Sequence, residues 1–223
     1  MIKKITIYLI LIFIFISSLC SQNKNELYIH LGYSQASQSP KIYSFYQTSY
    51  WRQNIHNEFV GAEYFRKIKN NSYIGIGFQI VEKGFKNKFK INLYNNLNII
   101  VEEINYYNKY EYLEFPFLYK CNIKNSFLCL GILNSILLNC MEGLGFTDTY
   151  TNGSIKEIKG TISRPELYRK FDIGMLARIG TQIKKDLFLD ISFTRGFRRV
   201  FIYNSDELNY NEVFMVGLNY KFM

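Results

Sequence analysis

Apolar and polar residues alternate with a period of two in four stretches of the chain. Ile74, Ile76, Phe78 and Ile80, for example, alternate with small or polar residues. A helix would scatter such a set around its circumference, whereas a strand places the two kinds of residue on opposite faces. We therefore predict strands over 73–80, 171–180, 187–194 and 214–222.

Four weaker stretches complete a predicted set of eight strands, over 26–35, 57–66, 109–121 and 126–139. The last is ambiguous, because apolar residues occupy both faces and Asn134 falls on the lipid side. The residues expected to face outward are Leu27, Ile29, Leu31, Tyr33, Val60, Ala62, Tyr64, Leu113, Phe115, Phe117 and Tyr119, together with the apolar sets of the four clear strands.

The predicted connections alternate in length. Those over 67–71, 122–125 and 183–186 are short and rich in turn formers, whereas those over 36–56, 84–106, 140–165 and 200–211 are long. Short periplasmic turns opposite long outer loops are typical of an outer-membrane barrel with both termini in the periplasm. The fold class expected is all-β, an eight-stranded antiparallel up-and-down transmembrane β-barrel. A soluble sandwich would also alternate, but loop lengths and strand lengths favour the membrane.

The first residues resemble a secretory signal peptide, with Lys3 and Lys4 before an apolar run from Ile5 to Ile16. The run is shorter than the roughly 20 residues of a spanning helix, which disfavours a retained anchor. We expect cleavage after Ser21, with 1–21 as signal and 22–223 as the barrel domain; lipidation of Cys20 is the alternative. The chain after cleavage then keeps three cysteines, Cys121, Cys129 and Cys140. An odd number of cysteines cannot all pair within the chain, which argues against a disulfide framework.

Composition narrows the expected partners. The chain has 19 Tyr, 19 Phe and three Pro, a balance that favours strands. Its 27 basic residues exceed 18 acidic ones, and without Lys3 and Lys4 the net charge is +7. In an exported protein this charge is better suited to anionic lipid or polysaccharide than to nucleic acid, for which no motif is present.

A segment of one predicted strand, Tyr112-Leu113-Glu114-Phe115-Pro116, resembles the signature of the PorT-like outer-membrane β-barrel family. Residues 171–180, 187–190 and 216–222 are similar to the last three strands of that family. The resemblance implies an eight-stranded outer-membrane barrel, and some relatives support protein secretion. Met223 after the terminal aromatic residue departs from the usual barrel ending. Pro116 indicates a bulge or bend, since proline removes a ladder hydrogen bond.

If the apolar faces meet lipid, seven charged residues point into the lumen. Eight strands leave room for packed side chains and not for an aqueous channel, so these charges should pair with one another. We expect Glu114 and Arg178 to belong to one network. The seven residues are Glu63, Glu114, Lys120, Asp172, Arg178, Asp190 and Lys221.

Catalytic and cofactor motifs are not evident. His30 shares a predicted lumen face with Ser34, and His56 adjoins a loop, but neither has the neighbours of a nucleophile activated by a base. The cysteines lack metal-ligand spacing, and no phosphate-binding glycine loop is present. We therefore expect neither an enzyme nor a cofactor; a barrel enzyme acting on lipid is retained as an alternative.

Two further groups of residues are expected to act in lipopolysaccharide contact and in barrel assembly. Arg195, Arg198 and Arg199 should reach the outer rim, where guanidinium groups can bind lipopolysaccharide phosphates. The final strand should close the barrel and carry the signal read by the barrel assembly machinery. Its outward residues are Phe214, Val216, Leu218, Tyr220 and Phe222, and we expect Phe222→Asp to do more damage than the lumen substitution Asn219→Asp.

The function predicted is a non-enzymatic outer-membrane barrel whose long loops bind something outside the cell or a partner protein. A secretion-accessory barrel is the alternative implied by the family resemblance.

Overall fold

The computed structural model of the chain describes residues 25–39, 48–92, 99–150, 155–163, 165–198 and 210–222. The predicted signal peptide, Cys20, Arg199, Met223 and most of the loop predicted over 200–211 lie outside them. No helix in these ranges is long and apolar enough to cross a membrane. The elements are β1 (Asn25–Ser39), β2 (Thr48–Lys69), β3 (Ser72–Asn92), β4 (Ile99–Ile123), β5 (Ser126–Tyr150), β6 (Ile155–Ile162), η1 (Pro165–Leu167), β7 (Phe171–Lys184), β8 (Leu187–Gly196) and β9 (Tyr210–Lys221).

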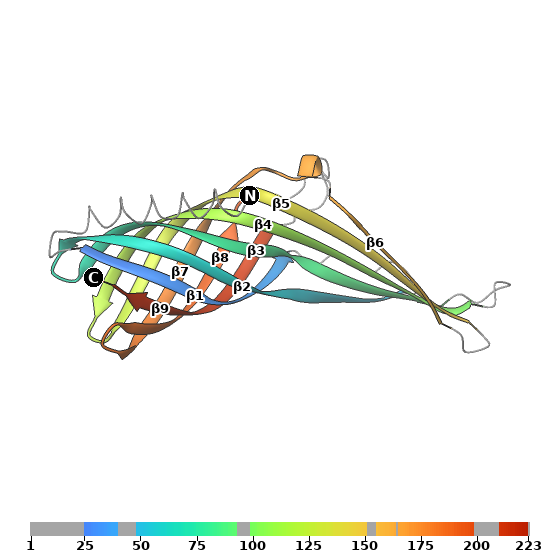
Figure 1. Cartoon of the computed structure of the whole chain (residues 1–223), viewed down its shortest axis with the longest axis horizontal. Helices are drawn as coiled ribbons and strands as arrows, with labels where there is room; N and C mark the ends of the chain where they lie inside the picture. Colours follow the sequence, from blue (N-terminus) through green and yellow to red (C-terminus); the bar gives the residue numbers. More distant parts are fainter. Residues whose placement is uncertain are drawn as a thin grey trace.

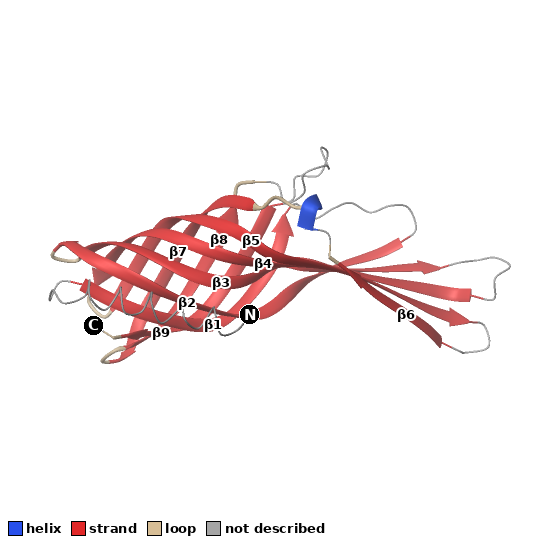
Figure 2. Cartoon of the chain, turned by 45° about the horizontal axis from the view of Figure 1, so that its top comes forward, coloured by secondary structure: helices blue, strands red, loops and turns tan. Residues whose placement is uncertain are grey.

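Eight of the strands form a closed antiparallel barrel. Each pairs with the next along the chain, except that β5 pairs with β7 around the short β6. Closure comes from β9, which pairs with β1 over twelve residues, from Tyr28 opposite Lys221 to Ser39 opposite Tyr210. Figures 1 and 2 show this cylinder at one end of the molecule. The predicted fold class is confirmed.

Side chains sort by parity as the sequence indicates. On β3, Ile74 and Ile76 are 52% and 56% exposed on the outer face, whereas the alternating Tyr73 is 8% exposed. The 126–139 stretch is indeed a strand, with Ile132 outward and Leu133 buried inward. Leu27 is the exception, because it has outward parity and is buried. An apolar outer face around a polar interior is the reverse of a soluble sandwich.

The three short turns occur where predicted, at 70–71, 124–125 and 185–186. Lys124 adopts a φ of 54°, the left-handed conformation that a tight turn of this kind uses. These turns, together with the ends of β1 and β9, define one end of the barrel, which we call the turn end.

Three of the four connections predicted as long loops, over 36–56, 84–106 and 140–165, are largely strand in their described residues, so the strand bounds predicted there were too short. β4 and β5 each have 25 residues, about 80 Å of extended chain, whereas a tilted strand crosses a bilayer in roughly ten residues. The excess forms an open antiparallel sheet in the order β2, β3, β4, β5, β6, which we call the outer sheet. It comprises residues 48–54, 85–92, 99–111, 140–150 and 155–162, and Figure 1 shows it projecting from the barrel.

Two irregularities mark the junction between barrel and outer sheet. The β2–β3 register shifts between Asn54 and Val60, where Gly84 of the facing strand adopts a φ of 135°. The β4–β5 register shifts between Glu111 and Tyr112. Such bulges bend a strand and increase its twist. Both of these irregularities lie where the strands pass from the barrel into the outer sheet.

Pro116 does not mark a bulge, contrary to the expectation from sequence. The β4–β5 register runs unbroken through the pairing of Pro116 with Leu133. On the other side, β3 has no recorded partners at Gly77 and Phe78, next to the proline. The missing N–H therefore interrupts one ladder without shifting its register.

Candidate functional site

The lumen is filled by polar side chains that the inward parity of eight strands brings together. Six of the seven predicted lumen charges are at most 5% exposed, and Lys221, at the turn end, is 28% exposed. The six are Glu63, Glu114, Lys120, Asp172, Arg178 and Asp190. Charges buried in this way must be paired, because isolated ones cost several kcal/mol each.

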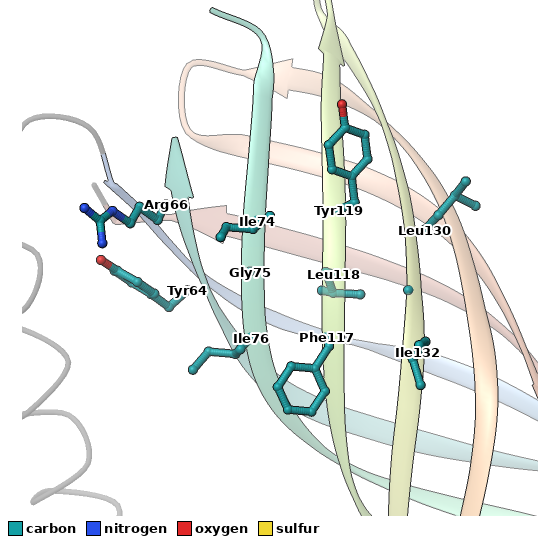
Figure 3. Close-up of a pocket in the computed structure, with 11 residues that line it drawn as sticks. Tyr64, Arg66, Ile74, Gly75, Ile76, Phe117, Leu118, Tyr119, Leu130 and Ile132 are labelled. Atoms are coloured by element: carbon teal, nitrogen blue, oxygen red, sulfur yellow. The ribbon is translucent and has the colours of Figure 1, made fainter. Parts of the chain in front are cut away.

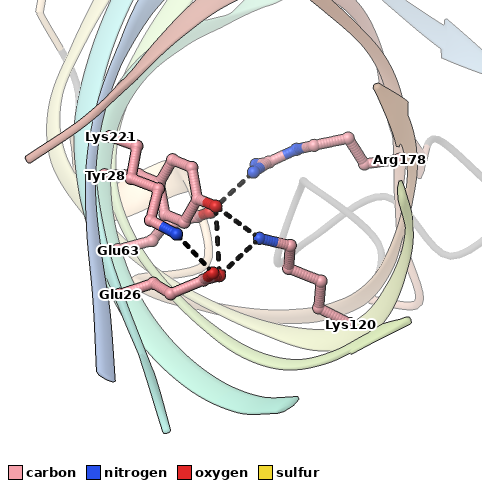
Figure 4. A network of polar contacts seen from close by, with 6 residues as sticks. All are labelled: Glu26, Tyr28, Glu63, Lys120, Arg178 and Lys221. Atoms are coloured by element: carbon pink, nitrogen blue, oxygen red, sulfur yellow. Dashed lines mark hydrogen bonds and ion pairs between the residues drawn. The ribbon is translucent and has the colours of Figure 1, made fainter. Parts of the chain in front are cut away.

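The charges nearest the turn end form one cluster around Glu26 (Figure 4). Lys120 Nζ lies 2.9 Å from Glu26 Oε2, and Lys221 Nζ lies 2.6 Å from Oε1 of the same carboxylate. The Tyr28 hydroxyl donates to Glu26 Oε2 at 3.0 Å and accepts from Lys120 at 2.6 Å. Three strands, β1, β4 and β9, are thus joined through one carboxylate.

Aromatic rings surround the Lys120 ammonium. Its Nζ lies 4.2 Å from the ring centroid of Tyr28 and within 5.4 Å of three others. A cation facing ring faces is attracted by their quadrupoles, and the attraction is stronger where water is excluded. The four rings are Tyr28, Phe65, Tyr73 and Phe127.

Arg178 joins opposite walls of the lumen. Its Nη1 lies 2.6 Å from Glu63 Oε2, and its Nε lies 4.0 Å from Asp190 Oδ2. The Asn219 amide donates to the same Asp190 oxygen. Asn219 therefore faces the lumen as predicted. The expectation that Asn219→Asp does less damage than Phe222→Asp took no account of this contact, and a second carboxylate would face Asp190.

Glu114 belongs to a separate cluster nearer the outer sheet. Its carboxylate lies 2.6 Å from Lys83 Nζ and accepts hydrogen bonds from Gln79 at 2.5 Å and Ser135 at 3.0 Å. Lys83 also lies 4.8 Å from the Tyr112 ring centroid. Among the described residues no contact joins this cluster to Arg178. The expected single network is therefore three charge clusters, around Glu26, Arg178 and Glu114.

An aromatic plug closes the lumen below the outer sheet. η1 carries the chain back over the barrel and places Tyr168 against Tyr110, with ring centroids 4.9 Å apart. Both rings are buried in an apolar cluster with Tyr112 and Met215. Burial raises the pKa of Tyr168, so its hydroxyl stays protonated and donates to Glu142 Oε1 at 2.6 Å.

Sequence reasoning missed several members of these clusters. Lys83 lies on β3 beyond Ile80, where the predicted strand ended, and Glu26 is the first residue of the strand predicted over 26–35. Parity alone could have found Lys83, because every second residue of this strand from Tyr73 onward lies on the lumen face, and Lys83 belongs to that series.

The histidines do not form a catalytic pair with a nucleophile in the described residues. His30 is 1% exposed and packs edge-on against Phe59, with centroids 5.7 Å apart. Ser34 instead donates to the Asn57 carbonyl at 3.1 Å. Within the same ranges, no group of three His, Cys, Asp or Glu side chains is arranged to hold a metal ion.

Of the predicted rim arginines, Arg195 lies near the end of β8 that is away from the turn end, and Arg198 lies just beyond that end. Arg195 follows the outward parity of Ile191 and Phe193, and its Nε lies 3.6 Å from Glu212 Oε1. Arg198 is exposed, and its backbone N–H donates to Asp172 Oδ1 at 3.3 Å. On β9, Phe214, Val216, Leu218 and Tyr220 face outward, and Tyr220 packs against Phe222 at 4.8 Å.

The outer sheet combines ion pairs with an exposed edge. Lys88 and Glu103 lie 2.6 Å apart, and Lys109 and Glu82 lie 2.8 Å apart at its base. β6 pairs on one side with β5 and ends the strand order, so its other edge has no strand partner among the described residues. All eight of its residues are exposed.

Comparison with solved structures finds distant barrels. The attachment invasion locus protein Ail of Yersinia pestis, solved in complex with the heparin analogue sucrose octasulfate, is 13% identical, with 89% of this chain and 99% of that chain covered and a TM-score of 0.38. Neisserial surface protein A is 10% identical over 89% and 97%, with a TM-score of 0.37. The outer-membrane protease OmpT of Escherichia coli is 10% identical over 91% and 98%, with a TM-score of 0.31.

These likenesses are too remote to indicate a function, and no curated protein matches the sequence. The family comparison is decisive, because one family model matches residues 20–201, most of the chain. It supports an outer-membrane barrel in general and does not single out the PorT-like group. With its closed barrel, apolar outer face and charged lumen, the chain belongs to the outer membrane protein beta-barrel domain family and resides in the outer membrane.

Proposed function

We propose that this chain is a non-enzymatic surface barrel that binds a protein partner through its outer sheet, by pairing a strand of the partner with the free edge of β6. The observation that carries the proposal is the continuation of strand pairing beyond the barrel, from β2 to the single-sided β6. An edge strand presents unpaired backbone donors and acceptors, which are a template for an added strand.

The side chains of β6 support selective pairing. Ile155, Ile158 and Ile162 are between 51% and 66% exposed, which leaves apolar area for a partner to cover. Lys156 and Lys159 stand between them, and Lys159 lies 2.7 Å from the acidic Glu157. The edge keeps a net positive charge, which opposes pairing with a second copy of itself. An acidic partner strand fits this pattern best.

Tyrosines near the base of the outer sheet provide further contact area. Tyr106 and Tyr107 are half-buried on β4, beside the ion pairs of the same strand. Tyrosine is enriched in protein interfaces because it combines a large apolar ring with a hydroxyl. The filled lumen supports a role on the surface, since three charge clusters and the aromatic plug occupy the route through the barrel.

The rim arginines are proposed to contact lipopolysaccharide phosphates. Arg195 has the outward parity and the height that such a contact requires, although Glu212 competes for its guanidinium. Export through residues 1–21 and recognition of β9 by the barrel assembly machinery are also parts of this proposal.

The two alternatives have less support. A secretion-accessory role of the PorT type rests on family resemblance, and no contact in the described residues favours it. A lipid-acting enzyme needs an activated nucleophile, and His30 and Ser34 are engaged elsewhere.

Site-specific photocrosslinking in intact cells tests the proposal. A photoreactive amino acid at Ile158 should give discrete protein adducts, which disappear when Ile155 and Ile162 are both replaced by Lys. The matched control is the same probe at Lys185 in a short turn. Adducts to a secretion component from Lys185, with none from Ile158, would favour the secretion role and overturn the proposed one.

A further inference from the structure

A groove of about 540 Å³ lies on the outer face of the barrel wall, across β2, β3, β4 and β5 near the turn end (Figure 3). It is separate from the lumen clusters and from the outer sheet. Its lining residues are Tyr64, Arg66, Ile74, Gly75, Ile76, Phe117, Leu118, Tyr119, Leu130, Gly131 and Ile132.

Strand register places the groove's outward side chains in two rows. Ile74 is paired with Arg66 on one side and with Tyr119 on the other, and Tyr119 is paired with Leu130. This row is nearer the short turns. The deeper row, two residues further along each strand, contains Tyr64, Ile76, Phe117 and Ile132.

The barrel wall behind the groove is closely packed on its lumen side. An added Cβ at Gly131 would lie 2.3 Å from the Phe117 carbonyl oxygen, and one at Gly75 would lie 2.5 Å from the Phe65 ring. Only glycine permits these approaches without a shift of its neighbours. Both glycines have inward parity, so the groove lies between the two outward rows, and the deeper row is wholly apolar apart from the Tyr64 hydroxyl.

Apart from the Tyr64 hydroxyl, the polar side-chain groups of the lining lie at the end nearer the turns. Arg66 is the one charged residue of the lining, and it is exposed. The Tyr119 hydroxyl, in the same row, donates to Ser72 Oγ at 2.9 Å. A guanidinium at the interface binds phosphate through paired N–H groups, while its stem covers apolar surface.

We propose that this groove binds a phospholipid of the periplasmic leaflet, with an acyl chain along Ile76, Phe117 and Ile132 and the phosphate on Arg66. The position argues for this occupant, because the groove lies on the apolar outer face of the barrel and its charged row is the one nearer the turn end. The side chains of the groove also complement a phospholipid. The Arg66 guanidinium lies at the end expected for the phosphate headgroup, and the apolar row lies where an acyl chain would pack. The inference is independent of any role of the outer sheet.

Native mass spectrometry of the full chain in detergent tests the site, with dipalmitoyl phosphatidylglycerol as the probe. The wild-type barrel should bind one lipid. The Kd of the Arg66→Gln variant for this lipid should be about tenfold higher, as expected for loss of a charge-assisted hydrogen bond. Arg66→Lys should restore part of the binding. Ile76→Trp should also weaken it, because the larger ring fills the groove.

Matched controls distinguish a site from general lipid adhesion. Lys184→Gln removes an exposed cation from another turn, and Ile191→Trp enlarges a side chain that is 44% exposed on the outer face of β8. Both should retain wild-type lipid binding. Equal loss in these controls, or unchanged binding in both Arg66→Gln and Ile76→Trp, would overturn the proposal. Heat-dependent gel migration confirms that each variant is folded.

Discussion

Arg178 on β7 and Glu63 on β2 form an ion pair across the lumen, with Nη1 and Oε2 2.6 Å apart, although 115 residues separate them in sequence. Neither strand is adjacent to the other in the barrel. The pair therefore connects opposite walls of the barrel, and both of its charges are buried away from water.

Breaking this pair should destabilise the barrel strongly. Arg178→Met leaves Glu63 and Asp190 buried without their cation, which costs about 3–5 kcal/mol in comparable buried pairs. Chemical unfolding in detergent should show a lowered midpoint. The double variant Glu63→Met/Arg178→Met should be less destabilised than the sum of the single changes, because no charge of the pair is then left alone. A Lys159→Met control, in an exposed pair, should leave the midpoint unchanged.

The lumen clusters around Glu114 and around Arg178 should act independently. Glu114 is held by Lys83, Gln79 and Ser135, and Glu63 by Arg178, with no partner in common. Combining Glu114→Gln with Glu63→Gln should therefore give the sum of their separate losses in unfolding free energy, within about 0.5 kcal/mol. A coupling energy well above that value would show one network instead of two.

Asn219→Asp should destabilise the folded barrel. The new carboxylate would face Asp190, to which the native amide donates, and like charges in a closed lumen repel each other. Unfolding midpoints measured at neutral pH should drop. Asp190→Asn in the same chain should restore most of the loss, because it removes the repulsion. No loss in the single variant would mean that this contact is not made.

Phe222→Asp should act at a different stage. Phe222 is exposed at the end of the closing strand and packs on Tyr220, so a charge there meets the membrane interface and not the lumen. We expect less assembled barrel in the outer membrane, measured as heat-modifiable protein, with a near-normal midpoint for the fraction that assembles. A normal yield would contradict an assembly role for this residue.

Gly84→Ala should disturb the junction between barrel and outer sheet. Gly84 has a φ of 135°, and an added Cβ would lie 1.9 Å from the Asn108 carbonyl oxygen. A strained backbone of this kind costs about 1–3 kcal/mol. Limited proteolysis should cleave the outer sheet faster while the barrel keeps its heat-modifiable migration. Gly160→Ala, where an added Cβ meets nothing within 4 Å, is the matched control and should leave cleavage unchanged.

The sequence by itself determined the barrel. A period-two pattern arises wherever the two faces of a strand meet different environments, and lipid outside with a packed lumen inside supplies that contrast at Ile74, Ile173 and Leu218. The turns were equally readable, because their residues favour tight reversals. Once the apolar side of each strand was assigned to lipid, the alternate side chains had to point into the lumen. The buried positions of Glu114 and Arg178 could therefore be predicted.

Only the tertiary structure decided which charges meet and how far the strands extend. Parity places a side chain inside the lumen, but the stagger of the closed barrel sets its height there, which is why Glu114 contacts Lys83 and not Arg178. Beyond the bilayer the contrast between faces is lost. Strands such as β6, exposed at every residue, keep no alternation and can be recognised only through the backbone pairing that holds them.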